Sequence, residues 1–208
     1  MDLSDLPTPT LVLDRRKLSA NTEKMAERIQ SHGVGLRPHA KTAKSANVVR
    51  IASKSGVSGL AVSTLLEARY FLDHGFEDLV YAVCVAPSKL DELGALYTRG
   101  ANLKIITDNL VVAEAISEHP LSHKVLIEVD CGEHRTGVAA NSPQLLEIAA
   151  KICASGRSRV MGILTHAGHS YECRSSSDAA IVAETERLAA VTAARLLRES
   201  GYDTSIIS

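Results

Sequence analysis

The chain has 208 residues, of which 45% are hydrophobic, and this is enough for one domain with a full core. Its 23 basic and 24 acidic residues give a formal net charge of -1, which does not favour binding to nucleic acid or to an anionic membrane. No apolar run approaches the roughly 20 residues that span a bilayer, the acidic start does not resemble a signal peptide, and four widely spaced cysteines fit a reduced cytoplasm.

Short β-branched or apolar runs alternate along the chain with segments that have helical periodicity. Asp14, Asp108 and Ser142 are residue types that cap helix N-termini, and Thr64 and Glu67 have the spacing of a capping box. Glycines stand where several of these helices would end. The alternation predicts a parallel sheet with strands at residues 10–13, 35–40, 59–62, 79–83, 103–107, 125–129, 160–165 and 204–207.

Eight such repeats favour a (β/α)8 barrel over an open, doubly wound sheet. A barrel needs a helix to cover its eighth strand, and the sequence ends at Ser208, where that strand ends. We therefore expect residues 1–208 to form one α/β barrel domain that lacks its C-terminal part.

The second predicted strand ends in a basic run, at the edge where parallel barrels carry their active sites. Alternation places Arg37, His39 and Lys41 on one face, where three basic groups are costly unless a bound anion or another partner compensates them. A lysine partly removed from water among other cations favours the nucleophilic amine that forms a Schiff base. The alternative is an exposed strand tip with solvated charges, the fate of roughly nine lysines in ten.

The sixth and seventh predicted strands also end in polar residues. After the sixth, two glycines frame a turn that carries Arg135, whose guanidinium could bind a phenolate oxygen or a substrate carboxylate. An ion pair between Asp130 and Arg135 that closes the turn explains the pattern equally well. After the seventh, His166 could stack on a cofactor ring, and His169 and Tyr171 follow in a loop.

A zinc site formed by His166, His169 and Cys173 is a poorer interpretation of this stretch. Gly168 breaks the helix that would bring two of these side chains to one face, and a structural zinc site needs a fourth ligand at recognisable spacing. We therefore expect no metal ligands here, and Tyr171 could equally be a loop aromatic with its hydroxyl in water.

Several of these motifs resemble one known family. The run Arg-Pro-His-Ala-Lys-Thr at residues 37–42, preceded by residues 8–14, is similar to the D-threonine aldolase and D-serine dehydratase-like family, which has a barrel of alanine-racemase N-terminal type (fold type III). Residues 63–68, 128–138 and 165–171 fit as well, so the resemblance covers essentially the whole chain. The last of these stretches looks closer to the D-serine dehydratases than to the aldolases.

The resemblance implies a role for each matching residue. Lys41 would form a Schiff base with pyridoxal 5'-phosphate and act as the base on one face of that cofactor. His166 would pack against the pyridine ring, Arg135 would lie near the phenolic oxygen or the substrate carboxylate, and Tyr171 would lie near the cofactor or the substrate. Further candidates, in supporting or cofactor-binding positions, are His39, Arg37, Thr42 and His169.

Two parts that the family implies lie outside this sequence. A Gly/Ser/Thr loop directly after the eighth strand holds the phosphate group, and the chain ends where that loop would begin. A C-terminal β-domain supplies ligands for a divalent metal, zinc or manganese, beside the substrate.

The expected activity is that of a pyridoxal-phosphate-dependent lyase acting on D-3-hydroxy amino acids, of D-serine dehydratase or D-threonine aldolase type. The alternatives are a non-catalytic protein that binds and carries pyridoxal phosphate, and an amino-acid racemase. The resemblance also implies a small D-amino-acid substrate and a homodimer. The cysteines and the charge described above favour a cytoplasmic protein with no nucleic-acid or membrane partner.

Overall fold

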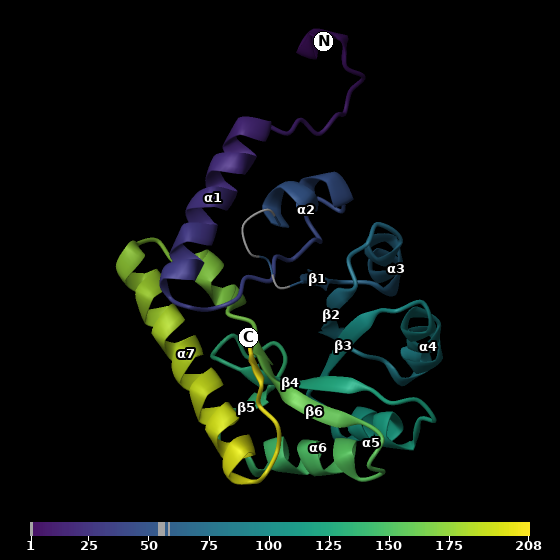
Figure 1. Cartoon of the computed structure of the whole chain (residues 1–208). Helices are drawn as coiled ribbons and strands as arrows, with labels where there is room; N and C mark the ends of the chain where they lie inside the picture. The colour runs from purple at the N-terminus through teal and green to yellow at the C-terminus, as the bar shows by residue number, and fades with distance from the viewer. Residues whose placement is uncertain (1, 54–56, 58) are drawn as a thin grey trace.

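The computed structural model describes residues 2–53, 57 and 59–208, and its centre is one parallel sheet. The strands lie in the order β1-β2-β3-β4-β6-β7, and the short β5 pairs with the end of β4. The sheet curls, and the helices lie outside it (Figure 1). The strands are β1 Leu60–Val62, β2 Asp78–Cys84, β3 Asn102–Thr107, β4 Lys124–Asp130, β5 Val138–Ala139, β6 Arg159–Thr165 and β7 Ile206–Ile207.

The sequence predicts the N-terminal caps of three α-helices correctly: those of α1, α3 and α6. Asp14 and Ser142 cap α1 and α6 as predicted, because their side chains accept hydrogen bonds from backbone N–H groups in the first turn. The prediction that Asp108 caps α5 was wrong. Asn109 caps this helix, and the Asp108 carboxylate instead accepts a hydrogen bond from the Gly137 N–H at 2.7 Å. The helices are α1 Arg15–Ser31, α2 Ala46–Ala52, α3 Leu65–Asp73, α4 Leu90–Thr98, α5 Leu110–Glu118, α6 Pro143–Cys153, α7 Ser176–Glu199, and the 3-10 helices η1 Leu3–Asp5, η3 Pro87–Lys89 and η4 Gly168–Glu172.

None of the helices within the described residues is long and apolar enough to cross a lipid bilayer. Their apolar faces instead pack on the sheet. Ile105 and Ile127 of the strands and Phe71 of α3 share one large core on the outer side of the curl. Alternate strand residues form a second, smaller cluster on the inner side, made of Val80, Ile106 and Leu126.

The predicted strands from residue 59 onward are confirmed, with bounds shifted by one or two residues. The strand at 10–13 was wrong: these residues pair with no strand, Leu11 is fully exposed, and the segment extends away from the sheet (Figure 1). The strand at 35–40 is reduced to two bridges, Leu36 to Val57 and His39 to Ala61, both parallel. β5 was not predicted.

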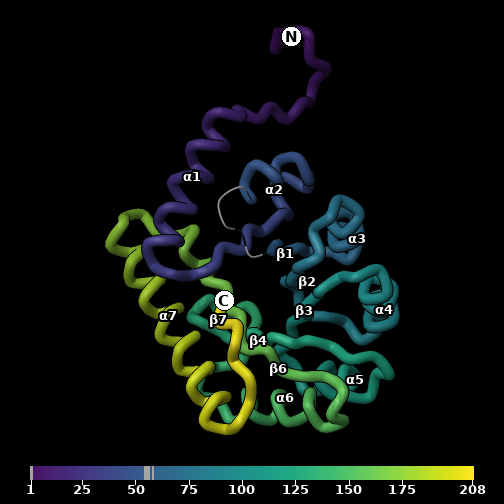
Figure 2. The backbone as a smooth tube through the Cα atoms, viewed as in Figure 1, coloured from purple at the N-terminus to yellow at the C-terminus, as the bar shows by residue number. Residues whose placement is uncertain are grey.

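The curled sheet is open within the described residues, because β7 pairs only with β6. Residues 36–40 run beside β1 as a continuation of the sheet, held by bonds from the Ala40 N–H to the Ala61 carbonyl and from the Ala61 N–H to the Pro38 carbonyl. The C-terminal residues lie beside β6 in the middle of the curl (Figure 2). Residues near the start of the sheet and the C-terminal residues thus approach the same interior space.

Candidate functional site

A cavity of about 510 Å³ opens at the carboxyl ends of the strands, inside the curl. This is the end at which parallel barrels carry their active sites, and the volume is that of a typical small-molecule pocket. The cavity brings together four residues proposed from the sequence for cofactor binding or catalysis, and these are Lys41, His39, Arg135 and His166. They come from three separate segments of the chain.

Lys41 follows directly on the segment that runs beside β1. The Ala40 N–H is bonded to the Ala61 carbonyl at 2.8 Å, and the Lys41 N–H donates to His39 Nδ1 at 3.2 Å. Lys41 lines the cavity but is exposed, so the partial removal from water that the sequence suggested is not found in this structure. Its backbone is held in place, and the residue is exposed at the cavity.

Glu67 of α3 fastens the loop that carries Lys41. Its buried carboxylate accepts from the Ser63 N–H at 2.8 Å and lies 3.1 Å from the ammonium of Lys44. Lys44 has a left-handed backbone, with φ of 46°, which brings its side chain back toward α3. Thr64 caps α3 as predicted, but the carboxylate of Glu67 bonds Ser63 rather than Thr64, so the reciprocal half of the capping box is not formed.

His39 is held neutral by its surroundings. Burial lowers the pKa of His39, and the nearby charge of Lys41 lowers it further, while Glu67 acts in the opposite direction. Because Nδ1 accepts from the Lys41 N–H, the proton of the neutral ring belongs on Nε2, which lies 3.5 Å from the Ser63 hydroxyl. The ring therefore links the Lys41 loop to β1 without adding positive charge.

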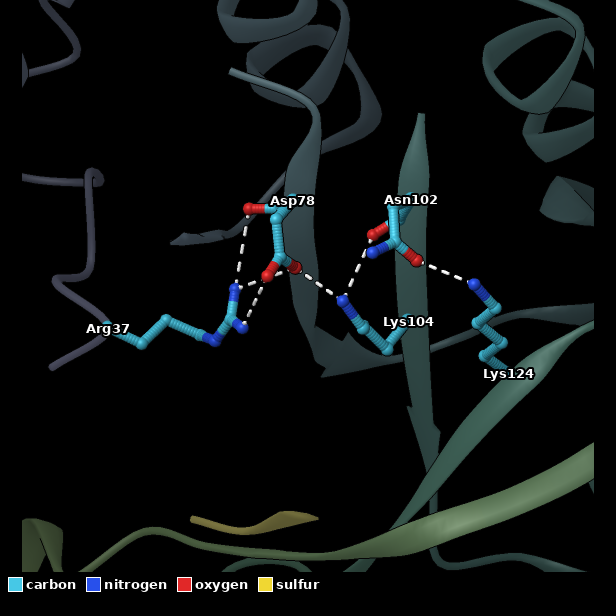
Figure 3. Close-up of polar contacts among 5 residues, drawn as sticks. All are labelled: Arg37, Asp78, Asn102, Lys104 and Lys124. Carbon is cyan, nitrogen blue, oxygen red and sulfur yellow. Dashed lines mark hydrogen bonds and ion pairs between the residues drawn. The ribbon is translucent and has the colours of Figure 1, made fainter. Parts of the chain in front are cut away.

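Arg37 also lines the cavity, but its guanidinium points to Asp78, the first residue of β2 (Figure 3). Its guanidinium makes two bonds of 3.1 Å to the Asp78 carboxylate, which also accepts from Lys104. Burial opposes ionisation of Asp78, but hydrogen bonds from Arg37 and Lys104 hold its pKa below the usual range. The expected anion that compensates Arg37 is therefore a carboxylate of the chain itself.

Arg135 and His166 are connected through a residue that the sequence did not single out. Glu133 Oε1 lies 3.5 Å from Arg135 Nη1, and Glu133 Oε2 lies 3.3 Å from His166 Nδ1. The alternative pairing of Asp130 with Arg135 was wrong, because Asp130 binds His134 Nδ1 at 2.6 Å. Burial opposes ionisation of Asp130, but hydrogen bonds from the Gly132 and His134 N–H groups lower its pKa. Arg135 is thereby left to face the cavity.

Three other candidates lie outside the cavity lining. Tyr171 lies in η4 and is 80% exposed, so its contact with a cofactor stays a prediction. Thr42 is exposed, and His169 packs beside Gly132 behind the cavity. In the part of the chain that the structure describes, His166, His169 and Cys173 do not come together as a metal-binding group.

A polar cluster at the ends of β2, β3 and β4 was missed by sequence reasoning. The Cys84 sulfur lies 3.3 Å from Asp108 and 3.0 Å from Glu128, so its single S–H proton is shared between the two carboxylates, and Glu128 also accepts from the Thr136 hydroxyl at 2.8 Å. Burial raises the pKa of the Cys84 thiol, and the two carboxylates raise it further, so the sulfur stays protonated. The signal was available, because a charged Glu128 within an apolar strand lies on the inner face by alternation.

The chain is similar to several known proteins. Residues 13–208 match a family model described as "Alanine racemase, N-terminal domain". The chain is 39% identical to D-threo-3-hydroxyaspartate dehydratase of Delftia sp. (strain HT23), over 99% of this chain and 55% of that protein. A solved structure of that enzyme matches with a TM-score of 0.93, over 98% of this chain and 55% of that one.

Two further relatives have related names. Identity is 27% to D-serine dehydratase of Dictyostelium discoideum, over 100% of this chain and 56% of that protein. It is 31% to D-threonine aldolase of Arthrobacter sp., over 99% of this chain and 55% of that protein. The chain thus spans about half the length of the curated relatives it matches.

Proposed function

This chain belongs to the family of the alanine racemase N-terminal domain, and from that premise we propose that it forms the cofactor-binding half of a pyridoxal-phosphate-dependent lyase acting on D-3-hydroxy amino acids. The predicted fold, an α/β barrel of alanine-racemase N-terminal type, is confirmed by the family match and by the Delftia structure. The observation that carries the functional proposal is the cavity, which gathers Lys41, His39, Arg135 and His166 at the carboxyl end of the sheet.

The residues present fit pyridoxal phosphate. The cavity has the size of a small-molecule pocket, and a buried ring nitrogen, His166 Nδ1, has no hydrogen bond of good geometry beside it. Lys41 would hold the aldehyde carbon covalently, His166 would pack against the ring, and Arg135 would bind an anionic oxygen of the cofactor or the substrate carboxylate. When bound, the cofactor supplies an electron sink for the substrate Cα.

The chain's own residues then bind and orient the amino acid. Arg135 would bind the substrate carboxylate or an anionic oxygen of the cofactor, and Lys41 Nζ, once the substrate amine has displaced it, would move the proton at Cα. His39 stays neutral beside Lys41, so no imidazolium lies next to the amine to protonate it. Loss of the β-hydroxyl gives dehydration, whereas cleavage of Cα–Cβ gives an aldehyde and glycine.

Dehydration is the favoured outcome. The stretch at residues 165–171 resembles the dehydratases, and two of the relatives described above are named dehydratases. The net reaction would release ammonia and leave a 2-oxo acid, which is pyruvate from D-serine and oxaloacetate from D-threo-3-hydroxyaspartate. The latter is the first substrate to assay, because the chain is 39% identical to a dehydratase named for it.

The divalent metal that the resemblance implies is not assigned to the described residues. The one group with suitable atoms among them, Cys84, Asp108 and Glu128, is occupied by hydrogen bonds within itself and to Thr136 and Gly137. One solved structure of a D-threo-3-hydroxyaspartate dehydratase is named as a C353A mutant in the metal-free form. We propose that any metal ligands of this protein lie beyond these residues.

The proposal includes a cytoplasmic homodimer that takes a small D-amino acid and has no nucleic-acid or membrane partner. The near-neutral charge and the four free cysteines within the described residues support it. Sedimentation velocity of the whole encoded protein measures the oligomeric state, and a monomer at micromolar concentration would remove this part of the proposal.

The cofactor proposal is tested on the whole encoded protein with added pyridoxal phosphate. Lysine-bound cofactor absorbs at about 420 nm, borohydride bleaches the band, and peptide mapping should then place the adduct on Lys41. The Lys41→Ala variant should lack the band, whereas Lys151→Ala, a lysine of α6 paired with Glu114, should keep it. A band that Lys41→Ala retains, or an adduct on another lysine, overturns the assignment.

The lyase activity is tested separately by product analysis. A protein that shows the band and releases a 2-oxo acid from D-3-hydroxy amino acids supports a dehydratase, and release of an aldehyde with glycine supports an aldolase. A protein that shows the band but converts none of these substrates has the behaviour of a cofactor carrier. Interconversion of D- and L-amino acids without cleavage indicates a racemase.

A further inference from the structure

Glu133 lies where three groups converge behind the cavity. Its Oε2 is 3.3 Å from His166 Nδ1 and accepts from the Gly168 N–H at 3.3 Å, and its Oε1 is 3.5 Å from Arg135 Nη1. Arg135 and His166 line the cavity, whereas Glu133 does not. The carboxylate therefore contacts two residues that face a ligand without facing it directly.

The hydrogen bonding of His166 Nδ1 shows which role this contact can have. The atom is buried and has no hydrogen bond of good geometry, although the carboxylate is 3.3 Å away. A buried ring nitrogen needs a partner, and bonds of this kind in an empty site tighten when a ligand is bound. A carboxylate accepts only, so the nitrogen that faces it must carry the proton.

Gly168 provides the space that Glu133 occupies. A Cβ at residue 168 would lie 2.2 Å from Glu133 Oε1 and 2.7 Å from its Cδ, both closer than real contacts. The backbone of Gly168 is not in the left-handed region, so a side chain here meets a limit of space rather than of conformation, and it would push the Glu133 carboxylate aside. The glycine and the carboxylate come from different loops and fit each other.

We propose that Glu133 is a positioning residue that holds His166 in the Nδ1–H tautomer, so that Nε2 presents a lone pair to the ligand in the cavity. Through its second oxygen Glu133 also aligns Arg135 beside the same ligand. The identity of that ligand rests on the function proposed above, but the position of the proton is a property of the chain alone. His166 is thus an acceptor toward the cavity rather than a donor.

The test is the protonation pattern of the His166 ring in protein without cofactor. Long-range proton–nitrogen spectra of uniformly 15N-labelled protein, at about pH 8.5 where an ordinary imidazole is neutral, distinguish the two tautomers. The His166→Gln variant identifies the signals of His166 among those of the other histidines. The wild-type ring should be protonated at Nδ1, and a ring protonated at Nε2 overturns the proposal.

Variants separate a specific role from general support of the fold. Glu133→Ala and Gly168→Ala should both lose the Nδ1–H signal, whereas Glu133→Gln should keep it because the amide oxygen still accepts. Glu147→Ala removes an exposed carboxylate on α6 and should change nothing. If Glu133→Ala retains the Nδ1–H form with the remaining spectrum intact, Glu133 does not set the tautomer.

Cofactor titration of the same samples distinguishes this proposal from the functional one. Glu133→Ala should bind pyridoxal phosphate more weakly than Glu133→Gln and the wild type, as followed by absorbance. A wild type that binds no cofactor but shows the tautomer and its loss in Glu133→Ala overturns the proposed function and supports the role of Glu133. Full cofactor affinity in Glu133→Ala overturns the part of the proposal that concerns the ligand.

Discussion

Each buried charge near the cavity has a specific partner within the chain. Glu67 is buried at 6% exposure, and its two oxygens face the Ser63 N–H and the Lys44 ammonium. At the other end of the sheet, the Asp78 carboxylate forms ion pairs with Arg37 and Lys104. Removing one member of such a pair leaves the other uncompensated, and this costs more than the pair itself contributes.

Replacement of Glu67 should therefore loosen the Lys41 loop. Glu67→Gln keeps an acceptor for the Ser63 N–H but removes the charge that holds Lys44, so we expect about 1 kcal/mol of destabilisation and weaker cofactor binding. Urea unfolding and cofactor titration measure the two effects. Glu92→Gln, which breaks the exposed pair with Arg69, is the matched control and should change neither. Equal behaviour of the two variants would show that the loop does not depend on Glu67.

At the level of elements, strands β6 and β7 approach each other very closely. β6 pairs with β7 through Gly162, which has φ of +134°, and a Cβ at that residue would lie 1.8 Å from the Ile206 carbonyl oxygen. The register between β4 and β6 also shifts beside this glycine. The close approach of β7 thus depends on one residue without a side chain.

Substitution of this glycine should release β7 from the sheet. Gly162→Ala should cost more than about 2 kcal/mol, because backbone strain and a steric overlap add to each other. Gly156→Ala is the control: it also has a positive φ, of +72°, but nothing within 4 Å, so about 1 kcal/mol is expected. Urea denaturation gives both values, and amide exchange of residues 206–207 reports the detachment. Similar costs for the two variants would contradict the role of the close contact.

The elements differ in how far the sequence determines them. Strands such as β3 and β4 are central and buried along almost their whole length, and their short apolar runs are sufficient to predict them. The segment 10–13 has the same pattern without a neighbouring strand to pair with in this structure, and pairing is not a local property. The same holds at the site: strand ends pointed to Lys41 and His166, whereas Glu133 acts through a contact between two loops that no spacing indicates.

At the scale of the whole molecule, a chain of polar contacts links separate elements at the other end of the sheet. His123, which is fully buried, bonds the Tyr97 hydroxyl of α4 at 3.0 Å and His119 at 2.9 Å, and His119 lies 3.2 Å from Asp91. Burial lowers the pKa of His123 to about 4, and the neighbouring His119 contributes. The unfolded chain binds a proton at this residue well before the folded one does.

Stability should therefore fall in acid through His123. Above about pH 6.5 both states are neutral at this residue, and as the pH falls toward 4 only the unfolded state gains the proton, so up to about 3 kcal/mol is lost. Urea unfolding of wild type and His123→Asn at pH 7 and about pH 5 measures this, because the variant cannot titrate there. The variant should lose less stability on acidification, and parallel losses would mean that His123 contributes nothing to it.

The strand order also determines when the site can first exist during synthesis. From β1 to β7 each strand pairs with one made shortly before it, so the sheet can assemble progressively while the polypeptide leaves the ribosome. The cavity, however, combines Lys41 from the early part of the chain with His166 and Ser208 from its late part. A nascent chain therefore has its lysine long before it has a pocket, and the cavity can hold a cofactor only after the residues up to Ser208 have been made.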